Sequence, residues 1–164
     1  MESYESLSSI VDWINENSYS GIIGIEGFSG SGKSTLADAV AREIGCTVIH
    51  TDDFAVKHKF PPKYTACLNV NDLKSAIAQV VKNGLVVVEG ICLRDVMGNL
   101  GLELHKTIYV KRLSMYGFWH DVVLLNEFEA GIRTNRSEPH LSDFKYHAAS
   151  KPHETCDIVY EWRQ

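Results

Sequence analysis

The stretch GFSGSGKS, residues 27–34, decides how this chain folds and what it can hold. It satisfies the spacing G-x-x-x-x-G-K-[ST], in which glycines let the backbone curl around an anion and the loop N–H groups point at it. In such a loop Lys33 reaches the β- and γ-phosphates of a nucleoside triphosphate, and the hydroxyl of Ser34 binds Mg²⁺. The predicted nucleotide-binding residues are Gly27, Ser29, Gly30, Ser31, Gly32, Lys33, Ser34 and Thr35.

The residues on either side of this loop support its assignment. Residues 21–26, GIIGIE, form a short apolar run with β-branched side chains, which is typical of a buried strand. Residues 34–44 carry apolar side chains at helical spacing, and Gly45 is suited to end a helix. Because strand, glycine loop and helix follow in the order that phosphate binding requires, we prefer a nucleotide site over a glycine-rich turn that binds nothing.

Size and composition indicate one α/β domain, residues 1–164. Hydrophobic residues make up 45% of the chain and charged residues 23%, which is typical of a globular protein, and no apolar run approaches the ~20 residues of a membrane span. A net charge of −5 opposes a nucleic-acid surface, and the acidic, polar N-terminus is unlike a secretory leader. We expect a cytoplasmic monomer or homodimer that binds neither nucleic acid nor membrane.

Hydrophobic patterning predicts the remaining elements. An amphipathic helix is expected over 1–18, a helix over 73–82 capped by Asp72, and helical structure around 122–128 within 114–131, whereas 132–143 looks irregular. Further strands are expected at 46–50, 85–88, 107–110 and 157–160. The alternation of strands and helices predicts the single-domain fold of P-loop NTPases, an about five-stranded parallel sheet with helices on both faces.

Acidic side chains follow two of the predicted strands. Asp52 and Asp53 come after residues 46–50, and Glu89 directly follows residues 85–88. Ligands of parallel sheets bind at the carboxyl ends of the strands, so these acids should meet the glycine loop there. One carboxylate can orient hydrated Mg²⁺ and another can accept the proton of an attacking hydroxyl. Alternatively, Asp52 or Asp53 is a turn or cap residue.

Four segments together resemble the uridine kinase-like P-loop kinases, the group that includes uridine, nicotinamide riboside, pantothenate and phosphoribulo-kinases. The matching segments are IIGIEGFSGSGKST (22–35), HTDDF (50–54), VVVEGI (86–91), and KP followed by CDIV (151–152 and 156–159). The resemblance implies ATP and Mg²⁺ as cofactors and a small-molecule acceptor. It also implies that Asp52 is the catalytic base, with Asp53 secondary, and that Glu89 contacts magnesium-bound water or the acceptor.

The resemblance further assigns catalytic roles to Lys33 and Arg112 and a magnesium site to Ser34, Asp52 and Glu89, partly through water. It places a mobile lid at residues 111–143, where the family has an Arg-Asp pair but this chain has His120-Asp121. Arg133 and Arg136 are candidates to replace the missing lid arginine. The acceptor segment is short, and it offers His58 and Tyr64 as candidate contacts.

Three functions follow from these residues. The leading hypothesis is an ATP- and Mg²⁺-dependent kinase that phosphorylates a hydroxyl of a nucleoside-like or other polar metabolite. The second is a nucleotide-binding protein with weak or no catalysis, because the lid is poor in arginine. A GTPase switch is the third, since residues 95–98 have the form D-x-x-G, although no Asn-Lys-x-Asp guanine reader is present.

Overall fold

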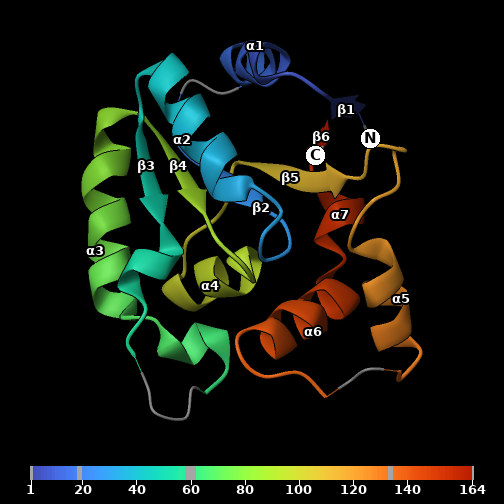
Figure 1. Cartoon of the computed structure of the whole chain (residues 1–164). Helices are drawn as coiled ribbons and strands as arrows, with labels where there is room; N and C mark the ends of the chain where they lie inside the picture. The colour runs from blue at the N-terminus through green and yellow to red at the C-terminus, as the bar shows by residue number, and fades with distance from the viewer. Residues whose placement is uncertain (1, 18–19, 58–61, 133–134, 164) are drawn as a thin grey trace.

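A parallel sheet of six strands is the centre of the molecule, in the order β1-β6-β5-β2-β4-β3 (Figure 1). The computed structural model describes residues 2–17, 20–57, 62–132 and 135–163. The strands within those ranges are β1 (Glu2–Tyr4), β2 (Gly21–Glu26), β3 (Thr47–His50), β4 (Leu85–Glu89), β5 (Lys106–Leu113) and β6 (Ile158–Arg163). The predicted single-domain parallel α/β fold is confirmed, with one strand more than expected.

The extra strand is β1, and it corrects the prediction of a helix over 1–18. Glu2 pairs with Ile158 and Tyr4 with Tyr160 in parallel register, so β1 extends the sheet beyond β6. The helix begins only afterwards, as α1 (Leu7–Asn17). A three-residue strand is too short to show a period of its own, and its partner β6 lies more than 150 residues away along the chain.

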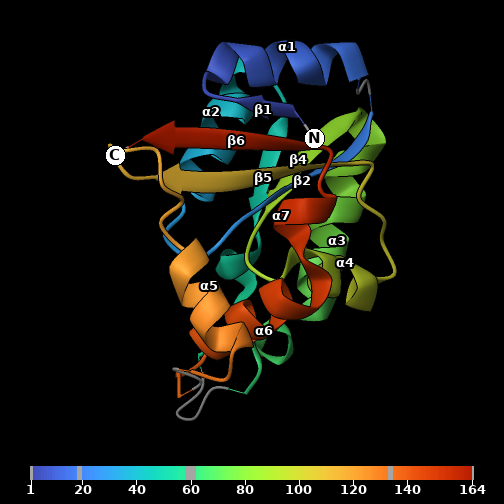
Figure 2. The same cartoon turned by 90° about the vertical axis from the view of Figure 1, so that its right-hand side faces the viewer.

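Helices cover both faces of the sheet (Figure 2). On one face lie α1 and α2 (Lys33–Ile44), and on the other lie α3 (Val70–Val80) and α4 (Leu93–Leu100). The chain then adds α5 (Val122–Glu129), α6 (His140–Ser150) and α7 (Pro152–Thr155). No helix in the described parts of the chain is long and apolar enough to cross a membrane.

Alternating side chains of β2 divide the interior into two apolar cores. Ile23 and Ile25 are fully buried against α1 and α2, whereas Ile22 faces the core under α3 and α4. Because successive strand residues point to opposite faces, one apolar strand serves both layers. The continuous apolar run that predicted a buried strand therefore reflects helices on both sides.

The start of α3 differs from the sequence-based expectation. The helix expected over 73–82 begins earlier, at Val70, and its cap is Asn69, whose side chain accepts from the N–H of Asp72 at 3.4 Å. Asp72 is thus the third helical residue, where a carboxylate still favours the positive helix end.

The C-terminal third holds the larger corrections. The helical structure expected over 114–131 is confined to α5, because residues 113–119 form a tight hairpin in which Leu113 pairs with Trp119. The segment 132–143, expected to be irregular, already contains the first turn of α6. The buried face of α6 includes the polar residues Asp143 and His147 beside Phe144 and Tyr146, so an apolar pattern does not mark this helix and packing against the rest of the molecule decides its structure.

Candidate active site

The loop between β2 and α2 has the shape of an anion cradle. Gly30 and Gly32 have φ values of +79° and +92°, which side chains with a Cβ avoid. The indole Nε1 of Trp162 donates to the carbonyl of Ser31 at 2.6 Å and fixes the loop from β6. No described side chain caps the N-terminus of α2, so its first N–H groups remain available to an anion.

Lys33 folds back over this loop. Its side chain is 6% exposed, and Nζ donates to the carbonyl of Phe28 at 3.4 Å. The hydroxyl of Ser31 is buried and makes no hydrogen bond within the described residues. An ammonium group and an unpartnered hydroxyl beside the N-terminus of a helix are suited to bind a polyphosphate.

Glu89 lies beside the first turn of α2, as its position at the end of β4 predicts. The hydroxyl of Ser34 donates to Oε1 of Glu89 at 3.1 Å, while Oε2 is buried and finds no partner among the residues described. An orphaned carboxylate oxygen next to a serine hydroxyl suits Mg²⁺ or its bound water. No group of three or more His, Cys, Asp or Glu side chains in the described ranges could hold a metal unaided, so further ligands would come from phosphate and water.

His50 completes this cluster and was missed by the sequence analysis. Its Nδ1 lies 2.7 Å from Oε1 of Glu89, and its Nε2 lies 3.2 Å from Oδ1 of Asp38. Burial opposes the charged form, but the hydrogen bond and charge of Glu89 outweigh it, so the pKa of His50 is raised. The feature that could have identified His50 is its position at the end of β3, where it pairs in register with Glu89 at the end of β4.

Asp52 lies in the short 3-10 helix Thr51–Phe54 that follows β3, and Tyr64 donates a hydrogen bond to its Oδ1. The hydroxyl of Thr51 lies 2.9 Å from that of Tyr64, whose only proton goes to Asp52, so Thr51 is the donor. Burial, followed by the bond to Asp52, raises the pKa of Tyr64. Tyr64 is 5% exposed and contacts the predicted base, whereas Asp52 and Asp53 are both exposed.

The predicted lid residues lie at the end of β5 and beyond it. Arg112 places Nη2 3.0 Å from Nδ1 of His120, and His120 in turn lies 3.2 Å from Asp121. Arg136 stacks its guanidinium 3.9 Å from the ring centre of Phe144. His58 and Arg133 lie outside the described residues, and the lid and acceptor roles of all these side chains stay predictions.

The first turns of α6 press against the glycine loop, which the sequence analysis did not foresee. The ring of His147 stacks on Phe28 with 3.6 Å between centroids, and Phe144 packs on the same ring at 4.9 Å. The N–H of Ser29 donates to Oδ2 of Asp143 at 2.9 Å. No local sequence pattern predicts these contacts, because more than 110 residues separate the glycine loop from α6.

A second unforeseen group braces the end of β2. Glu26 is fully buried, accepts from Nε of Arg94 at 2.9 Å and also accepts from the hydroxyl of Tyr146. This network connects the strand that enters the loop to α4 and α6. A buried carboxylate directly before Gly27 was visible in the sequence, but its partners were not.

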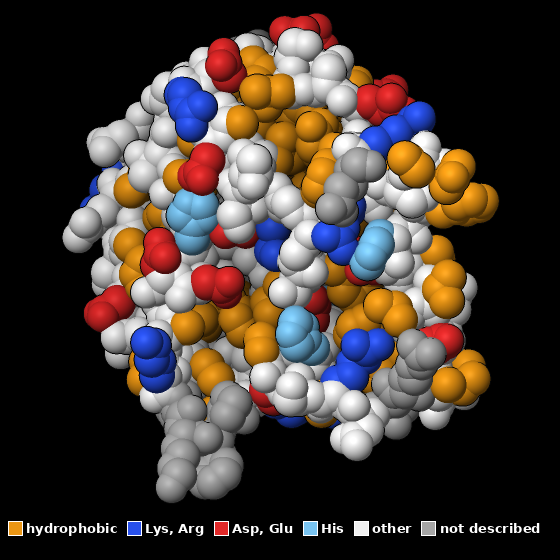
Figure 3. All heavy atoms as spheres, viewed as in Figure 1, with side chains coloured by type: hydrophobic (Ala, Val, Ile, Leu, Met, Phe, Trp, Pro, Cys, Tyr) orange, Lys and Arg blue, Asp and Glu red, His pale blue; other side chains and the backbone are white. Residues whose placement is uncertain are grey.

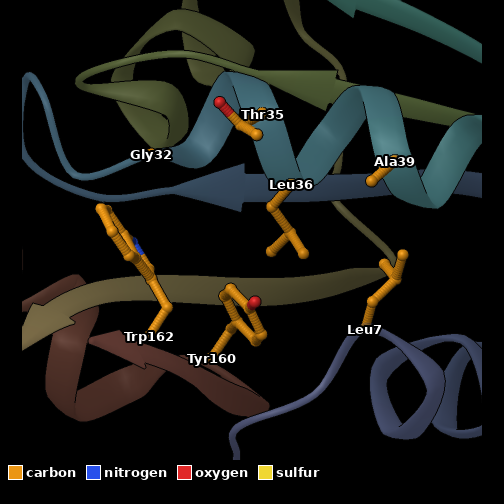
Figure 4. Close-up of a pocket in the computed structure, with 7 residues that line it drawn as sticks. All are labelled: Leu7, Gly32, Thr35, Leu36, Ala39, Tyr160 and Trp162. Atoms are coloured by element: carbon orange, nitrogen blue, oxygen red, sulfur yellow. The ribbon is translucent and has the colours of Figure 1, made fainter. Parts of the chain in front are cut away.

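A pocket of about 280 Å³ opens beside α2 (Figure 4). Trp162 and Tyr160 reach it from β6, and Thr35 and Leu36 reach it from α2. The same Trp162 contacts the loop, so the pocket continues from the anion cradle. On the face shown in Figure 3, charged side chains of both signs and histidines gather around the centre.

The fold of this chain, with a glycine loop that leads from β2 into α2, is shared with solved structures of proteins described as kinases. In particular, the structure is similar to a possible uridine kinase from Bacillus stearothermophilus, with a TM-score of 0.60 and 17% sequence identity over 94% of this chain and 96% of that one. A protein proposed to be a fructose transport system kinase from Silicibacter sp. TM1040 gives a TM-score of 0.52 and 13% identity, with 95% and 99% covered.

At these identities the likeness shows the fold. The sequence matches no family model. It also matches no curated protein. The site's chemistry therefore has to be argued from its own residues.

Proposed function

We propose that this chain is an ATP- and Mg²⁺-dependent kinase that transfers the γ-phosphoryl group to a hydroxyl of a nucleoside-like or other polar metabolite. The observation that carries the proposal is the contact of Ser34 with Glu89, whose second carboxylate oxygen is buried without a partner among the described residues. This pair lies beside a loop shaped for phosphates. Binding of an anion without metal would not need a buried carboxylate at that position.

The nucleotide is held by residues on both sides of the loop. N–H groups at the start of α2 and Nζ of Lys33 bind the phosphates, and the pocket between α2 and β6 receives the base. Trp162 offers a flat ring of the kind on which a base stacks. The indole is already held by the carbonyl of Ser31, so it needs no reorganisation to meet the ligand.

Asp52 performs the proton transfer. It accepts the proton of the acceptor hydroxyl as that oxygen attacks the γ-phosphorus, and the bond to the β-phosphate oxygen breaks with ADP as leaving group. Lys33 neutralises charge that develops between the β- and γ-phosphates. Ser34 and Glu89 would hold Mg²⁺, which would supply positive charge beside the phosphates.

The weak point of this mechanism is the supply of cations on the lid side. Arg112 lies near the end of β5, but its guanidinium already contacts His120. The guanidinium of Arg136 lies over the ring of Phe144, beside the loop. Loss of an arginine at the transferring group can cost a kinase about 10³-fold in rate. This favours, as second candidate, a protein that binds the nucleotide and transfers phosphate slowly or not at all.

The GTPase alternative loses its main support. Residues Asp95 to Gly98 lie inside α4, which begins after Cys92, and do not follow a strand directly. In a GTPase switch the aspartate ends a strand beside the phosphates. Here Glu89 occupies that place.

The test is phosphoryl transfer from ATP to a panel of nucleosides, sugars and polar vitamins, with and without a chelator of Mg²⁺. We expect Mg²⁺-dependent product with one acceptor class, and we expect Asp52→Asn to lower kcat by about 10²-fold or more. The matched control is Asp95→Asn, an equal loss of charge on α4, which should keep the wild-type rate.

Wild-type turnover by Asp52→Asn would remove Asp52 from the mechanism. ATP binding without transfer to any acceptor would favour the second candidate. A strong preference for GTP, together with loss of hydrolysis in Asp95→Asn, would instead restore the switch.

A further inference from the structure

Two neighbouring polar groups of the phosphate loop are held from opposite sides. The carbonyl of Phe28 accepts from Nζ of Lys33 at 3.4 Å, and it also accepts the N–H of Ser31 at 2.9 Å. The next N–H after this carbonyl, that of Ser29, donates to Oδ2 of Asp143 at 2.9 Å. The carbonyl and the N–H belong to one trans peptide unit, in which the two groups point in opposite directions. Asp143 therefore lies behind the loop, on the side away from Lys33.

The hydrogen bond from Ser31 to Phe28 closes a turn over residues 28–31. Its third residue, Gly30, has a φ of +79°, the positive value that this position of a type II turn requires. The N–H of the second residue, Ser29, has no acceptor inside such a turn and needs one from elsewhere. Asp143 supplies that acceptor, and because its side chain is 1% exposed, the hydrogen bond is shielded from water.

Helix α6 holds the side chain of Phe28 as well as the N–H that follows it. The ring of His147 stacks on Phe28 with 3.6 Å between centroids, and Phe144 packs on the same ring at 4.9 Å. The Phe28–Ser29 peptide is thus held at both of its ends by one helix. Rotation of this peptide would turn the carbonyl of Phe28 toward the carboxylate of Asp143, and two acceptor oxygens would then face each other in a buried place.

We propose that Asp143 is a positioning residue of the phosphate loop, which holds the Phe28–Ser29 peptide from behind and thereby fixes the turn and presents the Phe28 carbonyl to Lys33. The proposal rests on the proposed function only in requiring that this loop binds nucleotide. A loop that has its shape before the ligand arrives binds more tightly, because less conformational freedom is lost on binding. Nucleotide affinity therefore requires a hydrogen-bond acceptor at position 143, whereas the negative charge is dispensable.

The experiment is calorimetric titration of ATP and of ADP, each with Mg²⁺, into wild type, Asp143→Leu and Asp143→Asn. Leucine removes the acceptor, whereas asparagine retains a carbonyl oxygen and removes only the charge. We expect Asp143→Leu to bind both nucleotides at least about tenfold more weakly than wild type, because both use the same loop. Asp143→Asn should restore binding of both nucleotides to within about threefold of wild type.

The matched control is Asp157→Leu. Asp157 also accepts a backbone N–H, that of Thr107 at 2.7 Å, but it does so where β5 and β6 begin, at the opposite end of the sheet from the loop. This variant should bind both nucleotides within about twofold of wild type. Urea unfolding establishes that each variant is folded under the conditions of the titration.

Wild-type affinity in Asp143→Leu would overturn the proposal and leave the kinase assignment intact. Equally weak binding by Asp143→Asn and Asp143→Leu would also overturn it, because an acceptor at position 143 would then not be sufficient. If wild type bound neither nucleotide, the proposed function and this inference would both be refuted.

A measurement on the wild type decides the case in which Asp143→Leu does not fold. Hydrogen exchange of the Ser29 amide is followed by NMR in the protein without nucleotide. A shielded hydrogen bond to Asp143 predicts exchange at least about 10²-fold slower than in the unfolded chain, before any ligand is added. Exchange at the rate of the unfolded chain would show that Asp143 does not hold this N–H, and the proposal would fall.

Discussion

At the scale of single residues, the polar side chains around the loop are held mainly by one another. Tyr64 donates to the predicted base Asp52 and is itself supported by Thr51. Glu89 receives both Ser34 and His50. Each carboxylate is thereby oriented before any ligand arrives, which lowers the reorganisation that catalysis requires.

Tyr64 should act as a positioning residue for Asp52. In Tyr64→Phe the ring stays in place but Asp52 loses a donor, and a hydrogen bond to a charged group is worth about 1.5 kcal/mol, so we expect kcat to fall about tenfold. The Kd for ATP should remain within about twofold, since this hydroxyl does not touch the loop. Turnover assays and nucleotide titrations measure the two effects separately.

The control is Tyr116→Phe, which removes the same hydroxyl from a ring that is 80% exposed on the hairpin after β5. It should behave as wild type. Equal kcat in Tyr64→Phe and wild type would show that Asp52 needs no support from this ring.

At the scale of elements, the strand, loop and helix of residues 21–44 form a unit that β6 completes. Gly32 has a left-handed conformation, and a Cβ there would lie 2.9 Å from Nε1 of Trp162. That tryptophan also holds the loop carbonyl of Ser31. The last strand of the chain therefore determines which residue can stand in the loop.

Gly32→Ala should weaken ATP binding severely. The backbone strain is about 1–2 kcal/mol, and the indole must also move away from the loop, so we expect a loss of affinity of at least about tenfold. The matched control is Gly98→Ala in α4, where a Cβ would meet no described atom within 4 Å. Nucleotide titration compares the two, and wild-type affinity in Gly32→Ala would show that the loop can bind phosphates in another shape.

At the scale of the whole molecule, buried rings join β5, α6 and α7 behind the loop. His153 is 9% exposed, lies 5.1 Å from Trp119 between ring centroids, and lies 6.4 Å from His147. Burial, and then the neighbouring charge of His147, lower the pKa of His153 to about 4 from 6.5. The folded protein therefore keeps this imidazole neutral over a pH range in which the unfolded chain protonates it.

Stability should consequently fall in weak acid. Between pH 6.5 and about 4 the unfolded chain protonates His153, whereas the folded protein does not. The stability that the neutral imidazole contributes is therefore fully present above pH 6.5 and is lost as the pH falls toward about 4. Over this pH interval we expect the free energy of unfolding of His153→Gln to fall by roughly 1–2 kcal/mol less than that of wild type, after allowance for partial solvation of the ring. Urea unfolding at a series of pH values measures the difference.

The comparison variant is His140→Gln, which changes an exposed imidazole at the start of α6. Its unfolding free energy should follow that of wild type at every pH. A parallel pH dependence of wild type and His153→Gln would mean that His153 accepts its proton in the folded state as readily as in the unfolded chain.

Local sequence determined the parts of this protein whose partners are close along the chain. The loop, α2 and the strands β2 and β4 were predictable because glycine conformation, helical spacing and apolar runs act within a few residues. The positions of Asp52 and Glu89 followed as well, since the carboxyl ends of parallel strands share one edge.

Only the tertiary structure decided which side chains meet at that edge. Asp143 on Ser29, Tyr146 on Glu26 and Trp162 against Gly32 each join segments more than 100 residues apart. Strand β1 and the start of α6 likewise depend on surfaces that exist only after the sheet has formed. Such contacts leave no period in the sequence, because their energy comes from packing and from pairing of buried polar groups rather than from local preference.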